Sequence, residues 1–576
     1  MAEQEVLTSL ELVSTIVQWL RFITLEEEGI IIAEDRVPEL PRGWMGAFAG
    51  LARANRAFFH VSIEVLWERM DSLTPLFGYI LPGDKDKDGR PLNPLGFQKY
   101  KVTPNHWDRF KLYSPKIKVL SLSTNNAFDI SPGWMAYLLD STDRPATFLP
   151  NLRRLVLCSA NTLSLFIASN VASSISSLDI DLVGKAQSEV LDNGRALAAR
   201  LSQNAVSLTR LRLTHPTSPN IVAKVSQIVT LTSLHLCLAH GQDAGKINLH
   251  QLSRISSLES LSIEQILEPG DLKVAAIFPK GSLEAQPFID KGSNWQHLLS
   301  LSVKANPTTQ FIVATELLPV GLEKLELEIM ADTLNTQMVL VPLVTTIYAG
   351  RNPGLTTLSL SRYGSHSTSV NPEVLAPLRN DIQYANFEPF IASLSDLRLL
   401  TDLTIRDIPF LCVDIIPRVY KIARGLPGLK TLILDPDAIT ILEADELTSP
   451  NLRILEDVAK CNPHLTWLET AIGLSGDTIP ESPDNLISNH QLNCLALYST
   501  VEIDEFTAKE KLDLARYIDR VFPHAEILMA EWAVNNSYWE PWEFVNDLLQ
   551  FARETRERDV RLRGESKTEI TGMRLA

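Results

Sequence analysis

The most frequent pattern in the chain is a short alternation of leucines and polar residues, Leu-x-x-Leu-x-Leu or a close variant. Thirteen copies follow one another, and they end at Leu122, Leu157, Ile180, Leu213, Leu236, Ile263, Val303, Leu327, Leu360, Ile405, Leu434, Thr470 and Leu497. A weaker fourteenth copy lies around Ile527 and Leu528. Self-similarity of this kind predicts an architecture of stacked repeats.

Each copy predicts a short β-strand, because alternate residues of a strand point to opposite faces. In the copy that ends at Leu157, we expect Leu155 and Leu157 to point inward and Arg154 and Val156 to point outward. One strand cannot bury its apolar side alone, so consecutive copies should stack into a parallel sheet with a continuous leucine core. The sequence therefore predicts an α/β fold, with a leucine-rich-repeat solenoid over residues 115–530.

The segments between the copies predict the convex side of this solenoid. Successive copies end 23 to 45 residues apart, whereas regular leucine-rich repeats measure about 20–29 residues. The longer units should therefore carry loops or extra helical turns. Residues 189–205 and 415–428 have apolar residues at helical spacing, so helices and loops are expected opposite the concave strands.

The first 76 residues have a helical period instead. Leu10, Val13, Val17 and Leu20 lie three or four positions apart, which predicts one apolar helix face within residues 7–20. An acidic stretch with two prolines, residues 21–43, is expected to form a loop. Residues 43–73 again show helical spacing, with a break expected at residues 60–62. We expect three short helices over residues 7–76, then a linker over 77–114.

The N-terminal segment resembles the F-box of fungal F-box proteins that carry C-terminal leucine-rich repeats. Three phrases carry the likeness, and they comprise Leu51, Ala52, Arg53, Arg56, Ala57 and Phe58; Leu66, Trp67 and Met70; and Asp71, Ser72, Leu73, Pro75 and Leu76. Two features depart from the family's pattern. Leu10 stands where proline usually precedes Glu11, and the loop after the first helix is longer.

This resemblance implies the substrate-recognition subunit of an SCF-type ubiquitin ligase. Such a chain docks to a Skp-family adaptor, and through it to a cullin, while its repeats hold a protein substrate. The adaptor contact is expected at Leu10, Leu12, Ile16, Leu51, Phe58, Leu66 and Trp67. The alternative is that these side chains pack only within their own bundle, which would leave a free-standing repeat scaffold.

Target binding is expected on the concave face, at the outward positions of the strands. These positions include Arg154, Arg210, Arg212, His235, Lys324, Glu326, Glu328, Arg406, Asp435, Glu469 and Tyr498. Positive residues lie mainly in the N-terminal half and negative ones in the middle and at the end. A target with complementary charges is one hypothesis, and a merely solvated face is the other.

The last part of the chain changes in composition. Trp532, Trp539 and Trp542 lie close together before a charged stretch, so residues 531–563 predict a helical cap with an apolar inner face. A patch of aromatic residues that grips the target is the alternative. Residues 564–576 are expected to be a disordered tail.

Composition excludes several other classes of protein. The net charge of −16 disfavours nucleic-acid binding, and no apolar run approaches the roughly 18 residues that would cross a bilayer. The acidic N-terminal residues are unlike a signal peptide, and five cysteines form no disulfide framework. We therefore expect a protein of the cytosol or nucleus.

Catalytic and metal-binding motifs are not apparent in the sequence, which lacks a phosphate-binding loop, a zinc helix and a nucleophile turn. Asp84, Asp86, Asp88 and Gly89 imitate the start of a calcium loop. However, Leu95 stands where that loop needs a glutamate, so a solvated turn is the better interpretation. We expect no cofactor, no metal and no enzymatic activity. An enzyme whose site is assembled from distant residues is the remaining rival.

Overall fold

The computed structural model describes the greater part of the 576-residue chain. The described residues are 10–27, 42–54, 56–73, 75–81, 102–123, 137–138, 140–158, 174–181, 198–199, 201–203, 207–238, 249–265, 295, 297–317, 319–330, 344–363, 387–406, 416–435, 451–474, 479–480, 490–499, 506–527 and 540–573. The chain divides into two compact units. The first comprises Met1–Ala239 and Lys246–Leu258, and the second comprises His240–Gly245 and Glu259–Ala576.

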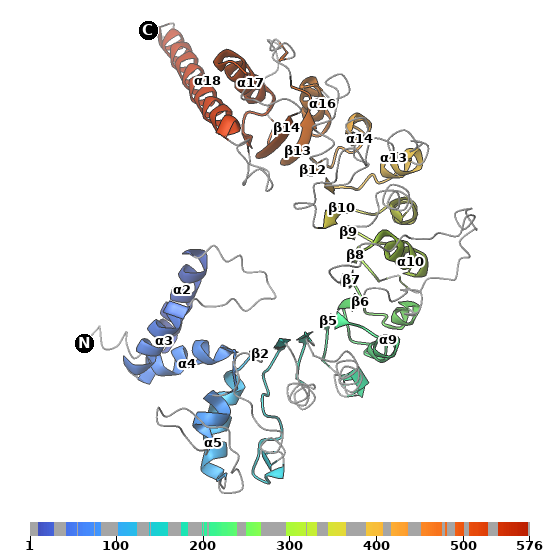
Figure 1. The fold of residues 1–576 in the computed structure, drawn as a ribbon. Helices are drawn as coiled ribbons and strands as arrows, with labels where there is room; N and C mark the ends of the chain where they lie inside the picture. The colour runs from blue at the N-terminus through green and yellow to red at the C-terminus, as the bar shows by residue number, and fades with distance from the viewer. Residues whose placement is uncertain are drawn as a thin grey trace. The chain divides into compact units, whose positions relative to one another are not determined.

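In its described part, the first unit begins with three packed helices, α2 (Leu10–Glu27), α3 (Arg42–Ala54) and α4 (Arg56–Glu68) (Figure 1). Their shared core consists of Val13, Val17, Phe48, Phe58, Val61 and Val65. Val13 and Val17 lie on the apolar helix face that the sequence predicts.

Two helix boundaries differ from the sequence-based prediction. The predicted break at residues 60–62 is wrong, because Phe58, Val61 and Val65 give α4 one continuous buried face, and the helices meet between Ala54 and Arg56 instead. Helix α2 also extends to Glu27, into the predicted loop. The first helix breaker after residue 20 is glycine at position 29, and the two prolines come later still.

The predicted linker over residues 77–114 contains ordered structure in its described part. After strand β1 (Arg69–Met70) come a π-helical turn, η1 (Pro75–Ile80), helix α5 (Pro104–Tyr113) and a 3₁₀ turn, η3 (Ser114–Lys116). Met70, expected in a helix, begins the sheet because β1 pairs with the first predicted strand. Helix α5 forms because Trp107 and Phe110 are fully buried. The calcium-like loop at residues 84–89 lies outside the described residues.

Six strands in the described part of the first unit pair in parallel in the order of the chain. They are β1, β2 (Val119–Ser123), β3 (Arg154–Cys158), β4 (Ser177–Ile180), β5 (Arg210–Pro216) and β6 (Ser233–Leu238). Helix α9 (Pro219–Val225) and the 3₁₀ turn η6 (Leu249–Arg254) follow β5 and β6. Figure 1 shows α9 to one side of the strands, and its residues Ile221, Val222 and Val225 are buried.

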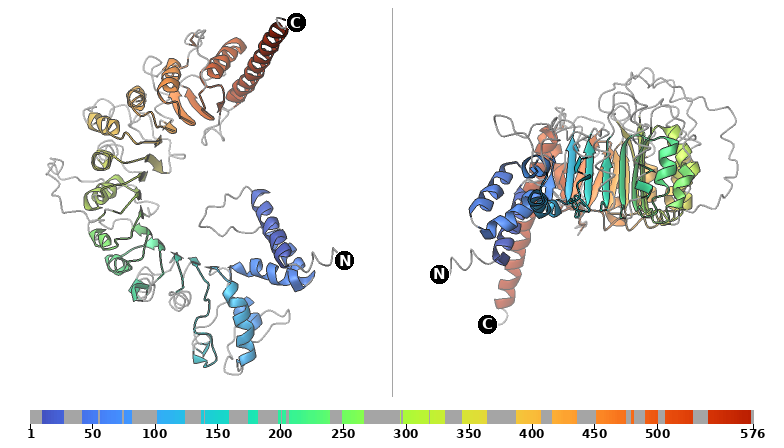
Figure 2. Two further views of the ribbon diagram at one scale, coloured as in Figure 1. Left: turned by 180° about the vertical axis from the view of Figure 1, so that it is seen from behind. Right: turned by 90° about the horizontal axis from the view of Figure 1, so that it is seen from below.

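The second unit repeats this arrangement with nine parallel strands among its described residues, also in chain order. They are β7 (Ser260–Gln265), β8 (Ser300–Ala305), β9 (Lys324–Met330), β10 (Thr357–Tyr363), β11 (Asp402–Arg406), β12 (Thr431–Asp435), β13 (Trp467–Ile472), β14 (Cys494–Ser499) and β15 (Glu526–Ile527). The helices are α10 (Pro307–Leu317), α13 (Phe387–Ser395), α14 (Ile416–Ala423), α16 (Arg453–Cys461), α17 (Ala508–Val521) and α18 (Glu540–Met573). Within each unit the strands lie side by side, as Figure 2 shows.

The thirteen leucine phrases coincide with strands β2 to β14, and the weaker fourteenth coincides with β15. Leucines of neighbouring strands are in register, as Leu155 with Leu178 and Leu178 with Leu211, and all three are almost fully buried. The predicted α/β fold of leucine-rich repeats is confirmed.

Buried asparagines connect adjacent repeats at the turns that precede the strands. The Asn352 side chain accepts hydrogen bonds from the backbone N–H groups of Gly321 (2.7 Å) and Leu322 (2.8 Å) and donates one to the Tyr348 carbonyl (2.8 Å). Gly321 has a φ of +97°, a conformation that glycine adopts without strain. Asn462 also bonds to the backbone of the preceding repeat, but as a donor, to the carbonyls of Ala423 and Leu426. The sequence signal is the shared Asn-Pro-x-Leu before β10 and β13.

Replacement of Asn352 by alanine is expected to lower the free energy of unfolding by about 2 kcal/mol, because two amides at a buried turn lose their acceptor. Urea unfolding followed by circular dichroism measures the change. Asn151→Ala is the control, since this exposed side chain donates a single bond to the Pro115 carbonyl; its loss should cost less than about 1 kcal/mol. Equal losses for the two variants would contradict the bridging role.

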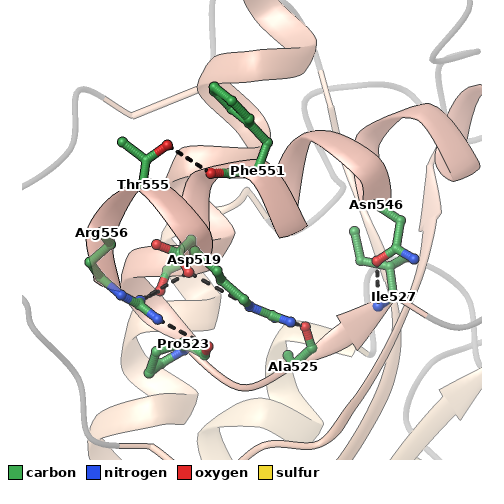
Figure 3. Close-up of polar contacts among 9 residues, drawn as sticks. Asp519, Pro523, Ala525, Ile527, Asn546, Phe551, Thr555 and Arg556 are labelled. Carbon is green, nitrogen blue, oxygen red and sulfur yellow. Dashed lines mark hydrogen bonds and ion pairs between the residues drawn. The ribbon is translucent and has the colours of Figure 1, made fainter. Parts of the chain in front are cut away.

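The C-terminal cap is formed by α17 and α18, which are held together around Asp519 (Figure 3). The buried Asp519 carboxylate lies 2.9 Å from Nη1 of Arg556 and 3.8 Å from Nε of Arg553. Burial raises the pKa of Asp519, and the two arginines oppose that shift. The Arg553 guanidinium also donates to the Ala525 carbonyl, and Asn546 accepts from the Ile527 N–H at 3.3 Å. Helix α18 is thereby fixed beside the last strand.

This helix is longer than the sequence-based prediction. It continues to Met573, past residue 564, and no proline interrupts residues 564–573. Val545 and Leu549 are buried and Trp542 is half-buried, as an apolar inner face requires. Trp532 and Trp539 lie outside the described residues.

Candidate functional site

The outward strand residues of the first unit form two rows across β3 to β6. One row joins Arg154, Ser177, Arg210 and Ser233, and the next joins Val156, Asp179, Arg212 and His235. These residues alternate with buried leucines along each strand, so both rows lie on the same face of the sheet. Four predicted target-binding residues, Arg154, Arg210, Arg212 and His235, are therefore neighbours.

The charge of this face is positive. Among the outward positions of β3 to β6 there are three arginines and one carboxylate, that of Asp179. Nη2 of Arg154 lies 2.5 Å from Oδ2 of Asp179, which neutralises one of the three cations. Arg210 and Arg212 are both exposed. Two guanidinium-bearing side chains on the same strand are thus exposed.

Among the charged residues at the outward strand positions of the second unit, carboxylates outnumber cations, and several of the two kinds form ion pairs. Lys304 on β8 lies 3.5 Å from Glu264 on β7 and 3.5 Å from Glu328 on β9. Lys324 and Glu326 form an ion pair along β9, at 2.8 Å. Three residues of these pairs, Lys324, Glu326 and Glu328, were predicted from the sequence as contacts for a target.

A further ion pair crosses β12. Nη2 of Arg406 lies 2.7 Å from Oε2 of Glu469, and the Glu469 carboxylate is buried. Arg406 therefore supports the sheet as well as facing outward. Asp435 and Tyr498 occupy outward register positions on β12 and β14, but their side chains lie outside the described residues.

The predicted adaptor-binding residues separate into an exposed and an internal group. Leu12 and Ile16 on α2 are 45% and 36% exposed. Trp19, which the sequence reasoning missed, is 61% exposed on the same helix. Positions 12, 16 and 19 are spaced by four and three residues, so they form one exposed stripe, which lies next to the face of the buried Val13 and Val17. We call these three residues the α2 stripe.

The internal group belongs to the helical core and its edge. Phe58 is only 8% exposed and belongs to the core of the three helices, so it differs from the exposed residues of α2. Leu51 and Leu66 are half-buried against the same core. The Trp67 ring stacks on Tyr113, with 4.7 Å between ring centroids, because α4 leads directly into the first repeat. The Leu10 side chain lies outside the described residues.

Two further findings bear on the site. The described residues contain no group of three or more histidine, cysteine, aspartate or glutamate side chains placed to hold a metal ion. Within the same part of the chain, no helix has both the length and the apolar content that a membrane span requires.

Comparisons with known proteins give a limited picture. No protein-family model matches the chain, and no curated protein matches it. Solved structures that it resembles include an internalin from Listeria monocytogenes, with 12% sequence identity, 68% of this chain and 80% of the internalin chain covered, and a TM-score of 0.27. The leucine-rich-repeat fold described above rests on the strand register and the buried leucines of this chain itself.

Proposed function

We propose that this chain is a non-enzymatic adaptor that holds a protein target on the outward strand face and docks through α2 to a Skp-family adaptor of a cullin-based ubiquitin ligase. The observation that carries the proposal is the α2 stripe. Two aliphatic side chains and one tryptophan remain exposed on a helix whose other face is already buried. Tryptophan and aliphatic anchors on a rigid element are the residues that dominate protein interfaces.

The helical module is joined to the repeats in a way that suits an adaptor. Nζ of Lys118 lies 2.9 Å from Glu68, and Nζ of Lys116 lies 3.1 Å from Glu64. Strand β1 follows α4 directly and pairs with β2. A target on the first repeats would therefore be held in a defined position relative to a partner on α2. Such a ligase role corresponds to a place in the cytosol or nucleus.

Phe58 favours a second candidate function. Because Phe58 is buried in the core of the three helices, it offers little surface to another protein. A free-standing leucine-rich-repeat scaffold, which binds its target without any ligase, needs only the strand face.

Co-purification with a Skp-family adaptor separates the two candidates. The test variant carries Leu12→Lys, Ile16→Lys and Trp19→Lys, which should reduce retention of the adaptor at least about tenfold because the anchors are replaced by charges. The control carries Leu112→Lys, Val229→Lys and Leu399→Lys, three exposed apolar residues elsewhere. Its retention should equal that of the wild type.

The outcomes assign the function. A wild-type chain that retains no adaptor supports the free-standing scaffold. If the wild type and the test variant retain the adaptor equally well, the adaptor contact lies elsewhere, and the α2 stripe does not carry the proposal. Equal melting temperatures of the two variants show that retention, and not folding, has changed.

A further inference from the structure

The three arginines of β3 and β5 form a cluster in which cations outnumber carboxylates. Arg154 is engaged by Asp179, and the next row places Arg212 directly beside that same aspartate. One outward carboxylate thus lies beside two guanidinium groups, and Arg210 adds a third cation on the strand of Arg212. The cluster is notable in a chain whose net charge is −16.

The register defines the spacing of the cluster. Arg154 and Arg210 occupy the same row two strands apart, which corresponds to about 9–10 Å between backbones. Arg210 and Arg212 point to the same face of one strand, about 7 Å apart. The row neighbours of Arg210 are Ser177 and Ser233, and the Arg210 side chain is exposed.

We propose that the cluster of Arg154, Arg210 and Arg212 binds an extended, carboxylate-rich segment of the target protein. This inference rests on the proposed function in one respect, namely that the target occupies the strand face. Side chains two positions apart in an extended segment are about 7 Å apart, which matches the spacing of Arg210 and Arg212. Guanidinium groups bind carboxylates through charge-assisted hydrogen bonds, and Arg154 donates one such bond to Asp179 on this face.

Charge argues for a peptide over a nucleic acid. A nucleic acid extends past any three-cation cluster and would meet the field of a chain with net charge −16, which repels a phosphate backbone. A short acidic segment engages only the cluster. Its binding should weaken as salt is added, because the contacts are exposed ion pairs.

The test measures fluorescence anisotropy of a labelled peptide of alternating glutamate and serine with the full-length chain. We expect binding by the wild type and at least about tenfold weaker binding by Arg210→Glu, Arg212→Glu, since two charge-assisted contacts are lost and reversed. The control is Lys224→Glu, Arg254→Glu, which makes the same change of net charge at two exposed residues of α9 and η6. Its affinity should stay within about twofold of the wild type.

Four results would overturn the proposal. They are no binding of the glutamate peptide by the wild type, an equal loss in the control variant, binding only of a phosphoserine peptide without carboxylates, and preferred binding of single-stranded DNA. Adaptor retention is measured separately. A chain that binds the peptide but no Skp-family adaptor keeps the arginine site and loses the ligase role, whereas a chain that retains the adaptor but not the peptide keeps the ligase role and loses the arginine site.

Discussion

Replacing Trp107 by alanine is expected to lower the free energy of unfolding of the first unit by about 3–5 kcal/mol, the cost of removing a large aromatic side chain from a packed core. Trp107 on α5 is fully buried. Its ring lies 5.5 Å from that of Phe110 and 6.1 Å from that of Phe148, and its Nε1 donates to Ser141 Oγ at 3.2 Å. The variant loses these aromatic contacts and leaves a cavity.

Trp19→Ala is the matched control for this prediction. The same substitution at this mainly exposed tryptophan should change the free energy of unfolding by less than about 1 kcal/mol, because surface changes away from the core are mild. Urea unfolding followed by circular dichroism measures both variants. Similar losses at the two positions would contradict the central place of Trp107 in the aromatic cluster. Adaptor retention should show the opposite order, with Trp19→Ala the more affected.

The repeats could be predicted from the sequence because one physical requirement recurs in every unit. A strand that buries one face needs apolar residues at alternate positions, and stacking then aligns equivalent positions, as for Leu155, Leu178 and Leu211. The segment between the three N-terminal helices and the repeats has no repeating pattern of this kind. Helix α5 and strand β1 depend on packing that is particular to this place, such as that of Trp107 and of Met70 beside Leu120. A single copy gives no periodic signal.

The candidate site could be predicted only in part. Alternation identifies which residues face outward, so Arg154, Arg210 and Arg212 were found as members of one face. It does not identify ion pairs, because side-chain conformations decide whether Arg406 reaches Glu469, 63 positions away. Trp19 was missed because the helical pattern was used to find the buried face of α2, although Leu12, Ile16 and Trp19 are also at helical spacing and form a second stripe beside that face.

His215 on β5 is expected to make the first unit sensitive to acid. The side chain is buried, and within the described part of the chain neither ring nitrogen has a hydrogen-bond partner. Burial lowers the pKa of His215 from 6.5 to about 4, because the imidazolium cation would lose its hydration. The unfolded chain therefore takes up a proton below pH 6.5 that the folded chain does not accept until about pH 4.

The direction in which stability changes with pH follows from the number of protons bound in each state. The unfolded state binds more protons between pH 6.5 and 4, so the stability that is present above pH 6.5 is lost as the pH falls, by about 3 kcal/mol at pH 4. Urea unfolding of the wild type and of His215→Leu across this range isolates the contribution, since leucine removes the titrating group. We expect the difference between the two proteins to grow as the pH falls, with the wild type losing more. Parallel pH profiles would show that His215 is protonated as readily in the folded chain as in the unfolded one, and that its buried surroundings do not disfavour the charge.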